Sequence, residues 1–400
     1  MVKELLEQLG YDKNSIKKIT DWYSTYLEDT LYTYIINTFE YFGKKGYLKK
    51  DIIKMTKSLP SIFCLSEENI ENRFKYLESK EYSKKDIIKI TKLLPQIFGL
   101  GEENIENKFK YLESKGYSEQ EIIKMTKSLP AIFGYSRENI EDKFKYLESK
   151  GYSKKDIIKM TKSFPAIFSL SEENIENRFK YLESKGYSEQ DIAKMTKLLP
   201  AIFGYSEENI ENKFDYLESK GYSKQDTIKL TKSFPTIFSY SEENIENKFK
   251  YLESKGYLKK DIIKITKLLP QIFGLGEENI ENKFKYLKLK GYSEQDIVKM
   301  TKLLPTIFGY SEENLDKKVE FYKEIDLEFI VTEETLRLMQ SVELTYARYR
   351  FFSDISIIIN QDNYLKLFVN QKQFIKQYGI NNNELINRYP YNQKVLIKEV

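Results

Sequence analysis

Hydrophobic and polar positions follow a pattern that recurs every 35 residues along most of the chain. Within residues 117–151, Ile122, Met125 and Leu129 are spaced by three and four residues, as on the buried face of an amphipathic helix. The preceding residues 118–121, Ser-Glu-Gln-Glu, have the form of a capping box, in which the two end side chains satisfy free backbone N–H groups of the first turn. The pattern therefore predicts a helix that begins directly after this serine.

A proline interrupts the apolar stripe at a fixed place in each repeat. Proline lacks a backbone N–H and disfavours helical geometry in the preceding residue, so the first helix should end at Pro130. The residues through Phe133 should then form a tight turn or a short 3₁₀ segment with apolar side chains inside. Ser136 caps a second predicted helix that runs to about Lys150, and Gly151 is its expected stop.

The same proline recurs eight times, which defines the register of the array. A period of this length predicts a solenoid, because one helix pair cannot bury its apolar stripes alone and needs neighbours to complete the core. We expect an all-α fold, a right- or left-handed α-solenoid of eight helix–proline turn–helix repeats over residues 47–326. Residues 1–46 have the character of a degenerate N-terminal helical cap, and residues 327–400, where the pattern decays, that of a C-terminal helical cap. The eight prolines are Pro60, Pro95, Pro130, Pro165, Pro200, Pro235, Pro270 and Pro305.

Composition restricts the classes of function. The chain has 65 Lys and Arg against 61 Asp and Glu, so any positive surface must come from segregation of charge. Histidine is absent and Cys64 is the only cysteine, which removes Cys/His zinc sites, disulfides and catalysis by imidazole. Carboxylates recur on polar positions of every repeat, and no isolated pair stands out as a general acid and base. We expect a non-enzymatic protein that has no cofactor and no metal.

The sequence has no features of a membrane span, a signal peptide or a transit peptide, and the expected cellular location rests on this. No apolar run reaches the roughly 18 to 20 residues that cross a bilayer. The first residues have neither a signal-peptide core nor the arginines of a transit peptide. We expect a cytoplasmic protein without membrane contact, while export into a host cell or entry into a nucleus stays open.

The order of motifs within each repeat resembles a known family. A helix ending in Leu-Pro-x-Ile-Phe, a short polar break, a second helix ending in a Phe-x-Tyr-Leu run and a Gly-Tyr-Ser opening are similar to the repeat of the mitochondrial transcription termination factors (mTERF). The resemblance covers residues 47–326, and the segment around Arg348 is similar to the arginine-containing C-terminal part of such proteins. It implies a solenoid of helix pairs that binds nucleic acid, typically duplex DNA, through a positively lined groove and acts on transcription or RNA maturation.

Two lysines recur on the first helix of every repeat in the pattern Lys-x-Thr-Lys. Because they are three residues apart they share a helix face, and stacking would align the pairs into a ladder that suits a phosphate backbone. Under the alternative interpretation they are the solvated face of an amphipathic helix. The candidate backbone-contacting residues are Lys54, Lys57, Lys89, Lys92, Lys124, Lys127, Lys159, Lys162, Lys194, Lys197, Lys229, Lys232, Lys264, Lys267, Lys299 and Lys302, with Arg348 added from the resemblance.

Two positions in the proline turn vary while the rest of the repeat is nearly constant, and changes two residues before the proline partly accompany them. Glutamine can pair with adenine, and alanine or a threonine methyl can contact thymine, which suggests a modular reader in which each turn meets one base or step. Drift in a tolerant turn, or the filling of neighbouring core space, would produce the same variation. The candidate base-reading residues are Ser61, Gln96, Ala131, Ala166, Ala201, Thr236, Gln271 and Thr306 directly after proline, and Cys64, Gly99, Gly134, Ser169, Gly204, Ser239, Gly274 and Gly309 three residues further on.

Two functions of different class follow from these patterns. The first is a nucleic-acid-binding repeat protein that modulates transcription, with duplex DNA favoured over RNA. The alternative is an α-solenoid scaffold for protein partners, including a secreted effector directed at a host. A scaffold should expose aromatic and mixed-charge anchors on its concave face instead of a basic stripe.

Overall fold

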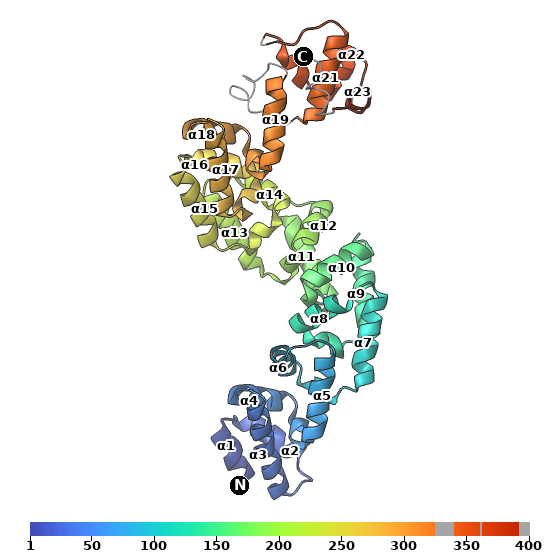
Figure 1. The fold of residues 1–400 in the computed structure, drawn as a ribbon. Helices are drawn as coiled ribbons and strands as arrows, with labels where there is room; N and C mark the ends of the chain where they lie inside the picture. The colour runs from blue at the N-terminus through green and yellow to red at the C-terminus, as the bar shows by residue number, and fades with distance from the viewer. Residues whose placement is uncertain (325–339, 361, 392–400) are drawn as a thin grey trace. The chain divides into compact units, whose positions relative to one another are not determined.

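The computed structural model describes residues 1–324, 340–360 and 362–391 (Figure 1). Every regular element in these residues is a helix, and helix pairs separated by a proline turn follow one another along the chain. The predicted all-α architecture of stacked helical repeats is thus confirmed.

Each repeat has a first helix of ten residues and a second helix of thirteen. The first helices are α4 (Lys49–Ser58), α6 (Lys84–Leu93), α8 (Glu119–Ser128), α10 (Lys154–Ser163), α12 (Glu189–Leu198), α14 (Lys224–Ser233), α16 (Lys259–Leu268) and α18 (Glu294–Leu303). The second helices are α5 (Glu67–Ser79), α7 (Glu102–Ser114), α9 (Arg137–Ser149), α11 (Glu172–Ser184), α13 (Glu207–Ser219), α15 (Glu242–Ser254), α17 (Glu277–Leu289) and α19 (Glu312–Glu324). The 3₁₀ turns between them are Pro60–Cys64, Pro95–Gly99, Pro130–Gly134, Pro165–Ser169, Pro200–Gly204, Pro235–Ser239, Pro270–Gly274 and Pro305–Gly309.

Local signals in the sequence determine where these helices begin and end. The hydroxyl of Ser118 accepts the backbone N–H of Glu121, whose carboxylate accepts the N–H of Ser118, so the predicted capping box is confirmed. Helix α8 ends before Pro130, and Ser136 caps α9. Gly151 follows α9 with a φ of 82°, in the left-handed region that favours glycine.

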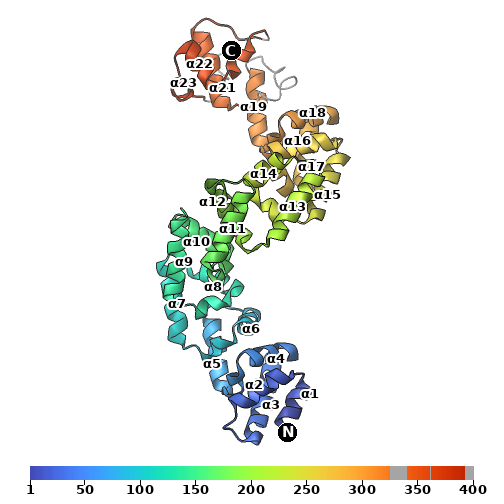
Figure 2. The ribbon, with the colours of Figure 1, turned by 180° about the vertical axis from the view of Figure 1, so that it is seen from behind.

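Neighbouring repeats stack in two layers. The chain divides into two compact units, Met1–Glu211 and Asn212–Val400. First helices pack side by side in chain order, α4 to α12 in the first compact unit and α14 to α18 in the second. Six of the second helices pack on the first helix of the following repeat, as α7 does on α8 and α15 on α16. In both views of the first compact unit, α7 and α9 lie on one side of α6 and α8, so first and second helices form separate layers (Figures 1 and 2).

In seven places along the described residues, a buried tyrosine at the start of one repeat bonds to a threonine of the next. Tyr117 is buried, and its hydroxyl lies 2.5 Å from Oγ1 of Thr161, the threonine of the Lys-x-Thr-Lys pattern. Because the single hydroxyl proton of Thr161 goes to the carbonyl of Ile157, Tyr117 is the donor between repeats. The same bond joins Tyr11 to Thr56, Tyr47 to Thr91, Tyr82 to Thr126, Tyr152 to Thr196, Tyr222 to Thr266 and Tyr257 to Thr301.

Further helices lie at both ends of the array. At the N-terminal end lie α1 (Val2–Leu9), α2 (Lys13–Trp22) and α3 (Glu28–Lys44), and α3 packs on α4. At the other end lie α21 (Val342–Asp354), a 3₁₀ segment at Tyr364–Phe368, α22 (Gln371–Tyr378) and α23 (Asn382–Arg388). The predicted start of the C-terminal cap at residue 327 lies outside the described residues. The division into two caps and a central array remains our proposal.

One repeat boundary has a glutamate where the others have glycine. Glu81 has a φ of 63°, whereas Gly116 at the next boundary has a φ of 102°. A side chain in the left-handed region costs about 1 kcal/mol, because its Cβ crowds the backbone. The Oε2 atom of Glu81 accepts an exposed hydrogen bond from Gln120, which offsets only part of this strain.

We therefore expect Glu81→Gly to stabilise the chain by about 1 kcal/mol. Urea denaturation of the full chain measures the change. The matched control is Gly116→Glu, which should destabilise, because a Cβ there would stand 3.2 Å from Cδ1 of Ile158 at an unfavourable φ. A lower stability of Glu81→Gly would contradict the expectation.

Candidate nucleic-acid interface

The two lysines of each first helix have different surroundings. On α8 the side chain of Lys124 is exposed. Lys127 is half-buried, and its Nζ lies 2.8 Å from the carboxylate of Asp86 in the preceding repeat. The second lysine of the pair thus holds neighbouring repeats together, whereas the first faces solvent. Equivalent ion pairs join Lys57 to Asp12, Lys92 to Asp51, Lys162 to Glu121, Lys197 to Asp156, Lys267 to Asp226 and Lys302 to Asp261.

The exposed lysine occupies the same place in all eight repeats, and we call these residues the outer lysines. They lie on first helices that are neighbours within each compact unit, so they form a row along each stack. The outer lysines are Lys54, Lys89, Lys124, Lys159 and Lys194 in the first compact unit, and Lys229, Lys264 and Lys299 in the second.

We call the second lysine of each pair the inner lysine. Six of the seven carboxylates named above also accept a hydrogen bond at the start of their own helix. Asp156 accepts from Lys197 across the repeat boundary and from Ser153 at the start of α10. The hydrogen bond from Lys197, followed by that from Ser153, lowers the pKa of Asp156. Lys162 likewise lowers the pKa of Glu121, and Lys267 that of Asp226.

These ion pairs make stacking sensitive to acid. A carboxyl whose pKa is lower in the folded than in the unfolded chain stabilises the fold above its unfolded pKa, and this contribution is lost as the pH falls through the folded pKa. We expect the melting temperature to fall below about pH 4. Asp156→Asn should reduce that dependence, whereas Glu148→Gln, at an exposed carboxylate outside these pairs, should not. Equal pH profiles for both variants would contradict this role.

A buried cation forms a further link between repeats that sequence reasoning missed. Lys143 is 7% exposed, and its Nζ donates to the backbone carbonyl of Leu170 in the next repeat. Burial lowers the pKa of this amine. The sequence signal for this burial is the position of Lys143 on the apolar face of α9, directly before Phe144. The same bond runs from Arg73 to Leu100, Lys108 to Tyr135, Arg178 to Tyr205, Lys213 to Tyr240, Lys248 to Leu275, Lys283 to Tyr310 and Lys318 to Gln340.

Charge is segregated between the two helix layers. In the first seven repeats, the first helices carry 23 lysines and 9 acidic residues, a net charge of +14. The second helices α5 to α17 carry 15 basic and 28 acidic residues, a net charge of −13. Although the chain is nearly neutral, its first helices are thus basic and its second helices acidic.

The proline turn separates constant from variable residues. Ile132 and Phe133 are buried, whereas Ala131 is half-buried and Gly134 is exposed. All eight turns follow this pattern, so the constant residues point into the core and the variable ones face the surface. Directly after proline, Gln96 and Gln271 are exposed, and Ser61, Ala131, Ala166, Ala201, Thr236 and Thr306 are half-buried. The position three residues further on is exposed in every turn, at Cys64, Gly99, Gly134, Ser169, Gly204, Ser239, Gly274 and Gly309.

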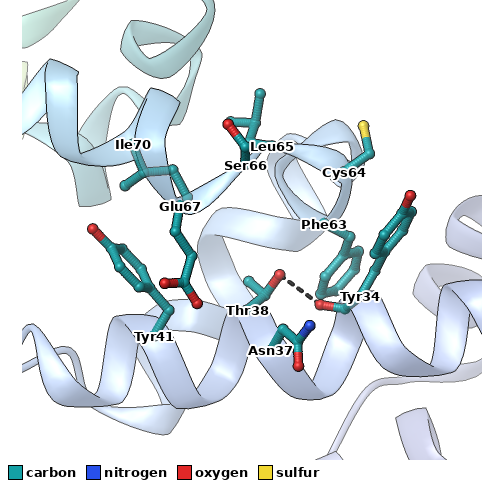
Figure 3. A pocket seen from close by; sticks show the side chains of 10 residues that line it. All are labelled: Tyr34, Asn37, Thr38, Tyr41, Phe63, Cys64, Leu65, Ser66, Glu67 and Ile70. Atoms are coloured by element: carbon teal, nitrogen blue, oxygen red, sulfur yellow. Dashed lines mark hydrogen bonds between the residues drawn. The ribbon is translucent and has the colours of Figure 1, made fainter.

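Where this later position has a hydroxyl or thiol, the side chain closes its own turn. The Sγ of Cys64 donates to the carbonyl of Ser61 at 3.0 Å, and Oγ of Ser169 to that of Ala166 at 2.6 Å. Figure 3 shows Cys64 beside a pocket of about 260 Å³ between α3 and the start of α5, with its sulfur pointing away from α3. These side chains thus have a local structural role.

Packing explains two of the glycines at the later position. A Cβ on Gly204 would stand 2.9 Å from Cζ of Phe164, at the end of α10 in the preceding repeat. A Cβ on Gly274 would stand 3.0 Å from the hydroxyl of Tyr240 and, in ordinary contact, 3.6 Å from Cζ of Phe234, whereas nothing lies within 4 Å of the position on Gly134. The residue directly before proline therefore contacts the turn of the following repeat, and its size limits which side chains fit there.

We expect Gly204→Ala to destabilise the chain by about 1 to 3 kcal/mol, because the methyl group collides with the ring of Phe164. Gly134→Ala is the matched control and should not destabilise. Adding Phe164→Leu to Gly204→Ala should remove the collision, so the two changes should be strongly non-additive in urea denaturation. Additive effects would contradict the packing explanation.

Arg348 lies inside the C-terminal helices and not on a nucleic-acid-facing surface, which corrects its place among the predicted backbone contacts. It is 1% exposed, and its guanidinium donates to the carbonyls of Leu367 and Val369 and to the side chain of Asn382. Its Cζ also lies 4.3 Å from the ring centre of Phe374. Arg348 thus joins α21 to the segments that follow it.

The stacked helix pairs define a helical-repeat protein. The family model mTERF matches residues 1–115, 100–220 and 206–331. The chain therefore belongs to the mTERF family, as its repeat motif indicated, and membership implies a nucleic-acid-binding helical-repeat protein. No curated protein matches the chain. Among the described helices, none combines the length and the apolar character that crossing a bilayer requires.

Proposed function

We propose that this protein binds double-stranded DNA through the outer lysines and modulates transcription, acting in the cytoplasm. One observation carries the proposal: every repeat exposes a lysine at the same place on the basic helix layer. A row of evenly repeated cations suits a phosphate backbone, which is itself a regular array of single negative charges. The inner lysines support the row, because their ion pairs hold the first helices next to one another.

The proposed contact has a measurable electrostatic signature. If each of the eight outer lysines neutralises about one phosphate, log affinity should fall against log salt with a slope of roughly −7. Because phosphate contacts carry no base sequence, selectivity has to come from other residues, and the surface residues of the proline turns are our candidates. Duplex DNA is favoured over RNA because that is what resemblance to the family implies.

A scaffold for protein partners remains the alternative. The acidic layer favours it, because a net charge of −13 on seven second helices suits a basic protein surface and repels DNA. The two functions therefore use opposite layers, which allows an experiment to separate them.

The test replaces four exposed lysines of the first helices by Gln. Its control makes the same number of replacements at exposed lysines of the second helices. The variant with Lys54, Lys89, Lys124 and Lys159 replaced by Gln removes outer lysines of the first compact unit. The control replaces four exposed lysines of the second helices, Lys75, Lys110, Lys145 and Lys180, so both variants lose the same charge. We expect the first variant to bind a random-sequence duplex more weakly, with the magnitude of the salt slope reduced by about 3 to 4.

The control variant should bind with nearly the affinity and slope of the unchanged chain. Equal losses in both variants would mean that net charge, and not the outer lysine row, drives binding. A slope near zero for the unchanged chain would contradict the proposed function. A duplex RNA of the same sequence, measured at the same salt, tests the preference for DNA.

A further inference from the structure

First helices contact the proline turn of the following repeat, as α4 and α6 do in the first compact unit. In the first compact unit, Nε2 of Gln96 donates to Oγ of Ser58 at 3.4 Å, across the junction between two repeats. Phe164, directly before Pro165, also lies against the next turn, because a Cβ on Gly204 would stand 2.9 Å from its ring. Compared with Ser58 and Gln96, this contact lies one residue further along the helix end and three residues further along the turn. Two independent contacts thus show that the end of a first helix lies against the next proline turn.

This junction lies beside the outer lysines. Ser58 is exposed and follows Lys54 by four residues, so the two side chains share one face of α4. Gln96 is also exposed. A duplex held by the outer lysines would therefore meet both partners of the junction and not the turn alone.

We propose that the unit that reads a base is the junction, formed by the residue two before proline in one repeat and the residue after proline in the next. The proposal rests on the proposed function and deepens it, because it adds a row of specificity-determining residues at the helix ends. Within the compact units the pairs are Ser58 with Gln96, Leu93 with Ala131, Ser128 with Ala166, Ser163 with Ala201, Ser233 with Gln271 and Leu268 with Thr306.

The serine–glutamine pair has the chemistry to select adenine. Ser58 accepts one N–H of the Gln96 carboxamide, which leaves Oε1 and the second N–H free. These two groups can pair with the N6 amine and N7 of adenine in the major groove. Ser58 is then a positioning residue, which fixes the rotation of the amide and does not itself touch the base.

The leucine-containing pairs have a different chemistry. Leu93 is 54% exposed, and its partner Ala131 adds a methyl group without a hydrogen-bonding side chain. Such a junction offers apolar contact to the C5-methyl group of thymine. The second compact unit has the same two residue types at Ser233 and Gln271, where the hydroxyl of Ser233 donates to the carbonyls of Lys229 and Leu230 in its own helix.

The experiment selects preferred duplexes from a random library with the full chain at fixed salt. It compares Gln96→Ala, Ser58→Ala and the double variant, and Ser128→Ala is the matched control, because its partner Ala166 has no amide to orient. The three substituted residues are exposed, and thermal melting verifies that each of the four variants folds.

We expect Gln96→Ala to lose about tenfold preference for adenine at one position of the selected sequence. Ser58→Ala should weaken the preference severalfold at that same position, and the double variant should not exceed Gln96→Ala, because the serine acts only through the amide. Ser128→Ala changes a different junction, so it should leave the adenine preference at the position read by Gln96 unchanged. The salt slope of all variants should equal that of the unchanged chain.

The outcomes separate this inference from the proposed function. A shift with Gln96→Ala but none with Ser58→Ala would overturn the junction and leave reading by single turns. Unchanged preference in every variant, with salt-dependent binding retained, would overturn base reading here and leave the phosphate contacts. Absence of salt-dependent binding by the unchanged chain would overturn both proposals.

Discussion

The stack depends on a hydrogen bond that no single repeat can form. Helices of ten and thirteen residues are marginal on their own, so each pair needs a neighbour to be stable. The buried hydroxyl of Tyr117 would lie unsatisfied without Thr161, and an unpaired buried donor costs about 1 to 3 kcal/mol. Because the partner must be a fully buried threonine one repeat away, this bond favours a single register of stacking.

Once this register is set, the charged groups divide between two tasks. Inner lysines pair with the caps of preceding helices, and buried lysines such as Lys143 bond to carbonyls beyond the next turn. On the first helix and turn of each repeat, the exposed residues include an outer lysine, a variable helix end and a variable turn position. The residues that we propose to meet DNA are therefore those that the stacking does not use.

The sequence predicted the local structure well because serine caps, prolines and glycines act within a few residues of themselves. It did not distinguish Lys124 from Lys127, since both share one helix face and only the second lies near Asp86, 41 residues earlier. The burial of Arg348 and the constraint of Phe164 on Gly204 were hidden for the same reason. Features that depend on contacts between repeats require the stacking register, which periodicity alone does not supply.

The contact between a helix end and the following turn has a consequence for how such genes change. Residues 94–112 and 269–287 are identical, which is the trace of a copied segment. A duplicated block carries its internal residue pairs with it, and new pairs arise only where its two borders meet older repeats. If these pairs read bases, a duplication lengthens the DNA target by bases that the copied pairs already prefer. The new pairs at the borders of the copied block would add base preferences that the older array did not have.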